Sequence, residues 1–187
     1  MSKMIQTATF ANGCFWCTEA IFKRLKGVLS VTPGYTGGKR PNPSYEQIHT
    51  GVTGHAESLQ ITFDPQIISY NALLDVFWVT HDPTTKDRQG NDVGSEYRSM
   101  ILYHTDEQKE QAFAAKKKLE ENKTYSDPIV TEIVPYTVFY PAEQYHKDYY
   151  DTNREAPYCR VIIDPKVHKL LEKFSDKVKE QYLDNTR

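Results

Sequence analysis

The stretch "TATFANGCFWC", residues 7–17, changes its pattern in the middle. Residues 7–13 are typical of a strand that ends at a glycine. From Cys14 onward the apolar residues follow helical spacing, and Gly27 lies where such a helix would stop. A strand that passes directly into a helix, with two thiols and two aromatic residues at the junction, predicts an α/β arrangement and a site of chemistry in the same place.

Strands and helices alternate along the rest of the chain. The expected strands are residues 7–13, 28–35, 57–63, 98–104, 128–134 and 158–163. The expected helices begin at Cys14, at the capping box of Ser44 and Gln47, at Ser69, at the capping box of Thr105 and Gln108, at residue 142, and at Asp164 with Pro165. This order favours a two-layer α/β or α+β sandwich that forms a single domain over residues 1–187.

The composition is that of an ordinary globular domain. The 187 residues are 39% hydrophobic and 26% charged, and the net charge of −2 gives no reason to expect nucleic acid or an anionic membrane as a partner. No apolar run reaches the length of a membrane span, and the first residues have no signal-peptide core. Three cysteines are too few for a secreted disulfide scaffold, so we expect a monomer in the reducing cytoplasm.

The two thiols of "GCFWC" can be read in more than one way. Cys14 falls at the start of a helix, where backbone N–H groups and the helix dipole favour a thiolate nucleophile. Cys17 is one helical turn away and could close a disulfide with it. Zinc is the competing interpretation, but Cys159 stands without a second cysteine or a spaced pair of histidines.

Three further residues have both a structural and a functional interpretation. Phe15 and Trp16 are either core residues or an apolar pocket beside the nucleophile. Glu57 has the same parity as Leu59 and Ile61 on an alternating strand, so it either points into the apolar face or escapes at the strand end. If it is buried, its pKa rises and it becomes a usable general acid.

Five motifs in chain order resemble the peptide methionine sulfoxide reductases of the A class. They are "GCFWC" (13–17), "GYTGG" (34–38), "TGHAE" (53–57), "QGNDVGSEYRS" (89–99) and "FYPAEQYHKDYY" (139–150). The similarity runs from about Phe10 to Ile163, and its one departure, "GSEYRS" in place of Thr-Gln before the tyrosine, leaves Tyr97 unchanged. Two of the motifs lie in the long polar loops expected at 36–43 and 84–97, where loops are often functional.

The resemblance implies a role for each matching residue. Cys14 matches the nucleophile and Glu57 the acid that protonates the sulfoxide oxygen, while Tyr35 and Tyr97 match tyrosines that hydrogen-bond that oxygen. Phe15 and Trp16 match the pocket for the substrate methyl group, and Asp92 matches a polar residue near the substrate. His146 lies in a family motif, and we interpret its role as structural. The implied fold is a ferredoxin-like plait with a mixed sheet and flanking helices.

The implied reaction is thiol-dependent reduction of methionine S-sulfoxide, free or in oxidised proteins, for protein repair. Cys14 would become a sulfenic acid, a second thiol would condense with it to a disulfide, and thioredoxin, or a dithiol such as DTT, would reduce that disulfide. No bound cofactor or metal is implied. For the second thiol we favour Cys17, which is close to Cys14 in sequence, over Cys159, which falls where many family members carry a late cysteine.

Two other functions compete with this one. A thioredoxin-like dithiol-disulfide oxidoreductase would use Cys14 and Cys17 but would need neither Glu57 nor the tyrosines. A redox-sensing or zinc-binding module would not be an enzyme at all. Steady turnover of a methionine sulfoxide substrate would argue against the dithiol-disulfide oxidoreductase. Stoichiometric zinc in the purified protein would favour the redox-sensing or zinc-binding module.

Overall fold

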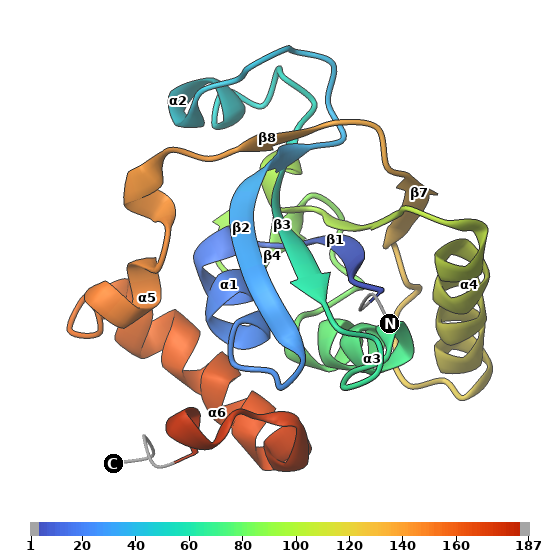
Figure 1. Ribbon diagram of the computed structural model, residues 1–187. Helices are drawn as coiled ribbons and strands as arrows, with labels where there is room; N and C mark the ends of the chain where they lie inside the picture. The colour runs from blue at the N-terminus through green and yellow to red at the C-terminus, as the bar shows by residue number, and fades with distance from the viewer. Residues whose placement is uncertain (1–3, 184–187) are drawn as a thin grey trace.

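A computed structural model describes residues 4–183, and its centre is a curled six-stranded mixed sheet with helices packed around it (Figure 1). The strand order is β7-β6-β1-β3-β2-β8. All neighbouring pairs are antiparallel except β6 and β7, which are parallel. The strands are β1 (Gln6–Asn12), β2 (Val28–Thr36), β3 (Ala56–Phe63), β6 (Ser99–Tyr103), β7 (Glu132–Pro135) and β8 (Phe139–Pro141).

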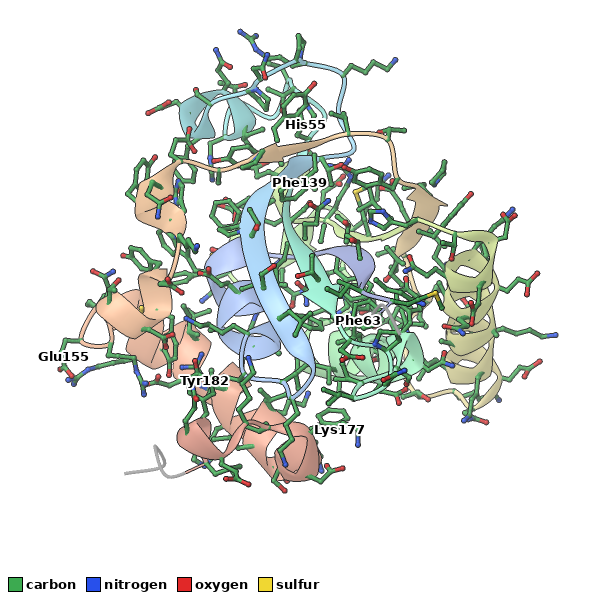
Figure 2. All side chains as sticks on the ribbon, in the orientation of Figure 1. His55, Phe63, Phe139, Glu155, Lys177 and Tyr182 are labelled. Carbon is green, nitrogen blue, oxygen red and sulfur yellow. The ribbon has the colours of Figure 1, made fainter. Side chains whose placement is uncertain are left out.

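Two helical crossovers build the four central strands. The chain runs from β1 through α1 (Phe15–Phe22) to β2, and β3 lies between these two strands. It then runs from β3 through α3 (Tyr70–Thr80) to β6, on the other side of β1. Both α1 and α3 contribute to one apolar core with the sheet, in which Phe63 is completely buried (labelled in Figure 2). The central strands and these two helices therefore share one core.

The expected helix starts are confirmed at three serine or threonine caps. Ser44 forms a full capping box with Gln47 at the start of α2 (Tyr45–Ile48). Ser69 accepts a hydrogen bond from Ala72 N at the start of α3. Thr105 caps α4 (Asp106–Glu121) by accepting from the amide of Gln108.

The prediction of a strand at residues 158–163 is wrong. Cys159–Ile163 is a short π-helix that runs directly into α6 (Asp164–Phe174). Cys159 and Ile163 are buried, but Val161 between them is 67% exposed, so the buried spacing is four residues and not two. The apparent alternation was coincidental, and Cys159 lies on a helix that packs beside α1.

Three other expected elements differ in detail. The loop expected at 84–97 contains a two-residue hairpin, β4 (Arg88–Gln89) and β5 (Asp92–Val93), followed by the 3-10 turn Ser95–Tyr97. The strand expected at 128–134 is confined to β7.

The helix expected at 142–150 is divided into the 3-10 turn Gln144–His146 and α5 (Tyr149–Thr152). Asp148 separates the two parts with φ +57°, a left-handed conformation that interrupts a helix. Within the described residues, no helix has the length and apolarity needed to cross a membrane.

Candidate active site

Cys14 lies at the junction between β1 and α1, where it occupies the N-cap position of the helix. Its carbonyl accepts from the amides of Cys17 (3.1 Å) and Thr18 (3.3 Å), which starts the first helical turn. The preceding Gly13 has φ +97°, and a Cβ there would lie 2.6 Å from Cγ of Gln89. Only glycine fits this turn, so the strand-to-helix junction is built around the position of Cys14.

The environment of Cys14 opposes the thiolate that a helix N-terminus favours, whereas that of Cys17 does not. Burial raises the pKa of Cys14 well above its usual value, and the neighbouring Cys17 and the negative charge of Glu57 raise it further. The hydrogen bond with Cys14 lowers the pKa of Cys17. Cys14 therefore rests as a thiol, and burial outweighs the effect of the helix end.

All three cysteines belong to one apolar cluster. Cys14, Cys17 and Cys159 are unpaired and buried, and they pack in the same cluster with residues of the segment that carries Cys159. Burial raises the pKa of Cys159 above its usual value. The wrongly assigned strand at 158–163 is thus the helix that brings the third thiol into the neighbourhood of the other two.

Glu57 lies on β3 and is 2% exposed, so of the two positions that its parity left open, the buried one is observed. Its Oε2 accepts from the amide of Phe15 at 3.0 Å, and its Oε1 lies 3.3 Å from Nε2 of His49. Burial raises the pKa of the carboxyl although both of these contacts oppose the rise. The bond to Phe15 ties the carboxyl directly to the residue that follows Cys14.

Four tyrosines lie around Cys14 and Glu57, and their contacts differ. The hydroxyl of Tyr97 is 3.0 Å from His49 Nε2. Burial raises the pKa of Tyr97, and it raises that of Tyr45 to about 12, with Glu57 and Cys14 adding to both shifts. Tyr35 instead donates to Oε2 of Glu143 at 2.7 Å.

The fourth tyrosine, Tyr158, links Asp92 to the thiols. Its hydroxyl donates to Oδ2 of Asp92 at 2.8 Å and lies 3.9 Å from Sγ of Cys17. A hydrogen bond from Tyr158 also lowers the pKa of Cys14, against the larger effect of burial. Asp92 therefore reaches the thiol region through Tyr158.

Phe15 and Trp16 occupy different environments. Phe15 is buried beside the rings of Tyr35 and His146, at centroid distances of 5.8 Å and 4.9 Å. Trp16 is partly buried and stacks on Tyr149, with a centroid distance of 3.7 Å and an interplanar angle of 8°. Its Nε1–H donates to Nδ1 of His146 at 3.1 Å, which gives this histidine a clear role in holding the indole.

Known proteins share this arrangement of sequence and fold. The family model described as peptide methionine sulfoxide reductase matches residues 6–179. The chain belongs to the peptide methionine sulfoxide reductase family. A peptide methionine sulfoxide reductase MsrA of Sulfolobus acidocaldarius is 58% identical over 173 residues, which are 92% of this chain and 97% of that protein.

Solved structures agree with the family assignment. The reduced form of Mxr1 from Saccharomyces cerevisiae superimposes with a TM-score of 0.78 and 32% identity, over 83% of this chain and 89% of that one. Mxr1 in complex with Trx2 superimposes with a TM-score of 0.56 and 26% identity, over 75% and 82% of the two chains. The activity of this reductase is the conversion of methionine sulfoxide to methionine.

The motifs of the reductase identified some of the polar groups around Glu57 and missed others. Tyr45 comes from α2 and His49 directly follows that helix, while Glu143 comes from the segment after β8 and Tyr158 from the segment before the π-helix. The signal for α2 was available, because the capping box of Ser44 places Tyr45 and His49 one helical turn apart on the same face. Tyr158 could not be found, because its segment was expected to be a strand.

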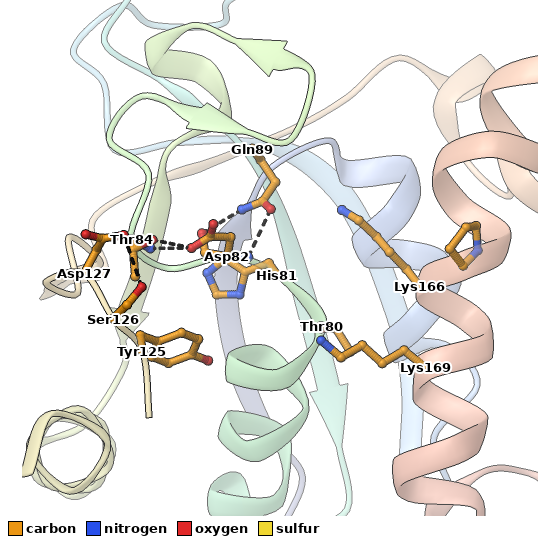
Figure 3. Close-up of a pocket in the computed structure, with 11 residues that line it drawn as sticks. Thr80, His81, Asp82, Thr84, Gln89, Tyr125, Ser126, Asp127, Lys166 and Lys169 are labelled. Carbon is orange, nitrogen blue, oxygen red and sulfur yellow. Dashed lines mark hydrogen bonds between the residues drawn. The ribbon is translucent and has the colours of Figure 1, made fainter. Parts of the chain in front are cut away.

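A cavity of about 490 Å³ opens at the end of α3, and none of the candidate residues lines it (Figure 3). Gln89 lies on its wall, where it donates to Asp82 O and accepts from Asp82 N. His81, also on the wall, has its pKa lowered by burial to about 3 and stays neutral. Within residues 4–183, no group of three or more His, Cys, Asp or Glu side chains is arranged to hold a metal ion.

Proposed function

We propose that the reductase acts on methionine S-sulfoxide, free or in oxidised proteins, with Cys14 as nucleophile and Glu57 as proton donor. One observation carries the assignment: the buried Glu57 carboxyl is hydrogen-bonded to the amide of Phe15, immediately after Cys14. A thiol and an acid are thereby held beside each other, as attack at sulfur with protonation at oxygen requires.

The first half of the reaction conserves atoms and charge. Glu57 gives its proton to the sulfoxide oxygen while Sγ of Cys14 attacks the sulfur. The thiol proton of Cys14 is released to solvent. The S–O bond then breaks as oxygen moves to Cys14, methionine leaves, and Cys14 is a sulfenic acid. Because burial keeps the pKa of Glu57 above its usual value, a proton is available there at a higher pH than for an exposed glutamate.

The phenols are assigned to the sulfoxide oxygen. Tyr97 and Tyr35 were expected in this role, and the structure supports the addition of Tyr45, since Glu57 and Cys14 act on the pKa of both Tyr45 and Tyr97. Raised pKa values keep these hydroxyls protonated, so they can donate hydrogen bonds. The role of Tyr35 is less direct in this structure, because its hydroxyl donates to Glu143.

The apolar part of the substrate is assigned to Phe15 and Trp16, with Asp92 as a polar neighbour. Trp16 presents a partly exposed ring that is fixed by Tyr149 and His146. A rigid aromatic surface beside the nucleophile suits a methyl group on sulfur. Asp92 would act near the substrate together with Tyr158, to which it is hydrogen-bonded.

We assign the second half of the reaction to Cys17, with Cys159 as the alternative. Cys17 interacts with Cys14 in the resting site, and its pKa is lowered while that of Cys159 is raised. Attack of the Cys17 thiol on the sulfenic acid forms a disulfide and releases water. Thioredoxin, or a dithiol such as DTT, would then reduce the disulfide, as the complex of yeast Mxr1 with Trx2 suggests, and no bound cofactor takes part.

We also propose that residues 1–187 form one domain, a ferredoxin-like plait extended by β7 and β8. The order β6-β1-β3-β2, with antiparallel neighbours and helical crossovers from β1 to β2 and from β3 to β6, supports that description. A monomer in the reducing cytoplasm fits an enzyme whose three cysteines are unpaired at rest.

The proposed function is tested by supplying the two sulfoxide epimers separately with thioredoxin, thioredoxin reductase and NADPH. Steady formation of methionine from the S epimer, with none from the R epimer, is the expected result. Reduction of insulin disulfides without methionine formation would instead support the dithiol oxidoreductase.

A further inference from the structure

His49 connects the acid of the site to one of its phenols. Its Nε2 lies 3.3 Å from Oε1 of Glu57 and 3.0 Å from the hydroxyl of Tyr97. The other ring nitrogen, Nδ1, lies 2.8 Å from the carbonyl oxygen of Tyr45. The imidazole side chain is 25% exposed, whereas that of Glu57 is 2% exposed, so His49 stands between the buried acid and water.

The carbonyl of Tyr45 fixes the state of the ring. A carbonyl oxygen can only accept, so Nδ1 of His49 must carry a hydrogen at all times. Any proton that the ring gains or loses is therefore on Nε2, the atom that faces Glu57. Two forms of the pair hold the same number of protons: imidazole with a carboxylic acid, and imidazolium with a carboxylate.

We propose that His49 is a positioning residue that returns a proton to Glu57 after each reduction. This inference rests on the proposed function, in which Glu57 gives its proton to the sulfoxide oxygen. The Nε2–H of the imidazolium then transfers its proton to Oε1 of Glu57, and Nε2 of the partly exposed ring takes up another proton from water. Cys14 releases one proton during its attack, and His49 takes one proton up from water. The reduction as a whole therefore consumes no proton.

Other titratable groups face the pair, and none reproduces the geometry of His49. They are Tyr45 on α2, Asp92 on β5, Glu96 and Tyr97 in the turn after β5, Cys14 before α1 and His146 after β8. The hydrogen bond with Glu57 is the main cause of the raised pKa of His49, with smaller support from Glu96. His146 has a lowered pKa and accepts from Trp16, so its Nδ1 is already occupied.

The variant His49→Gln separates hydrogen bonding from proton transfer. A glutamine amide can still contact Glu57 and Tyr97, but it does not titrate. In native enzyme the pair loses its last proton at a pKa that belongs to both groups, whereas in the variant Glu57 titrates alone. The alkaline limb of the single-turnover rate should therefore move to lower pH by at least ~1 unit. The acidic plateau should change by less than about threefold, since Glu57 is protonated there in both proteins.

The experiment measures methionine formed in a single turnover of methionine S-sulfoxide by excess enzyme across the pH range. His104→Gln is the matched control, because His104 follows β6 at the end of the sheet opposite to Cys14 and contacts Thr9. Its profile should match that of native enzyme. An identical profile for His49→Gln and native enzyme would overturn the inference, whereas a native enzyme that forms no methionine overturns the proposed function.

A second measurement needs no His49 variant. Nitrogen-15 NMR of the native reductase should show neutral His49 as the Nδ1–H tautomer, and its pKa should fall when Glu57 is replaced by Gln. A neutral Nε2–H tautomer, or a pKa that does not respond to Glu57→Gln, would contradict the proposed proton transfer even if His49→Gln failed to fold.

Discussion

The thiol side and the acid side of the active site are built in opposite ways. Cys14 and Cys17 are three residues apart on one helical turn, and they are surrounded by apolar and aromatic groups. Glu57, His49 and Tyr97 come from β3, the end of α2 and the turn after β5, and hydrogen bonds join them. A short stretch of sequence specifies the pair of thiols, whereas only the folded chain brings Glu57, His49 and Tyr97 together.

Burial has opposite chemical consequences on the two sides. It raises the pKa of Glu57, so the carboxyl keeps a proton to donate. It also raises the pKa of Cys14, so the proposed nucleophile rests as a thiol and is less reactive without substrate. The difference suggests that the enzyme activates the sulfoxide first and the thiol second.

The largest effect is expected on the thiol side, from Cys14→Ser. A serine hydroxyl cannot form the sulfenic acid, so no methionine should appear even in a single turnover. Rapid-quench measurement with excess enzyme tests this. Cys159→Ser is the matched control, and a normal burst from Cys14→Ser would show that another thiol attacks the sulfoxide.

Replacement of the second thiol should leave the first turnover intact and stop the next one. We expect Cys17→Ser to form about one methionine per enzyme and then stall in the thioredoxin-coupled assay, because no partner condenses with the sulfenic acid. Cys159→Ser should recycle normally. The reverse result would assign the disulfide to Cys159, and mass mapping of the oxidised native enzyme gives an independent answer.

On the acid side, Glu57→Gln should slow the single turnover by ~10²–10⁴-fold. The amide can keep the contacts with Phe15 and His49, but it cannot release a proton to the sulfoxide oxygen. The loss should be greatest where native Glu57 is protonated and should shrink as pH rises through its elevated pKa. A loss below about threefold at every pH would place the proton donor elsewhere.

The sequence predicted local features well. Strand parity allowed the burial of Glu57 without deciding it. The junction at Cys14 and the caps at Ser44, Ser69 and Thr105 follow from short-range chemistry. Each depends on residues within a few positions of one another. The central strands that hold Cys14 and Glu57 were predicted for the same reason.

Prediction failed where tertiary packing decided the outcome. Around Cys159 a four-residue burial period resembled strand alternation, and only the contact with α1 distinguishes the two. The contacts of His49 with Tyr97 and of Tyr158 with Asp92 join residues far apart in the chain, and a single sequence gives no signal for such pairs. The sequence therefore predicted only some of the residues that surround Glu57.

The phenols should have a smaller effect than Glu57. Tyr45→Phe and Tyr97→Phe should each cost about tenfold or less in single-turnover rate, because the remaining hydroxyl still donates to the oxygen. The double variant should lose roughly 10²-fold, which is the effect of removing an oxyanion donor. Tyr103→Phe is a suitable control, since Tyr103 ends β6 far from Cys14 in the sheet register. Small additive losses would indicate that Tyr45 and Tyr97 only pack.

The smallest effect is expected from Tyr35→Phe, and it tests whether Tyr35 belongs to the acid side at all. Its hydroxyl donates to Glu143, which also accepts from the amide of Tyr45. Loss of one such bond should slow turnover by about fivefold or less, equivalent to about 1 kcal/mol. If Tyr35 acts through Glu143, then Tyr35→Phe and Glu143→Gln together should cost little more than either alone. If Tyr35 instead donates directly to the sulfoxide oxygen, the two losses should multiply, and a double-mutant cycle on the single-turnover rate distinguishes these outcomes.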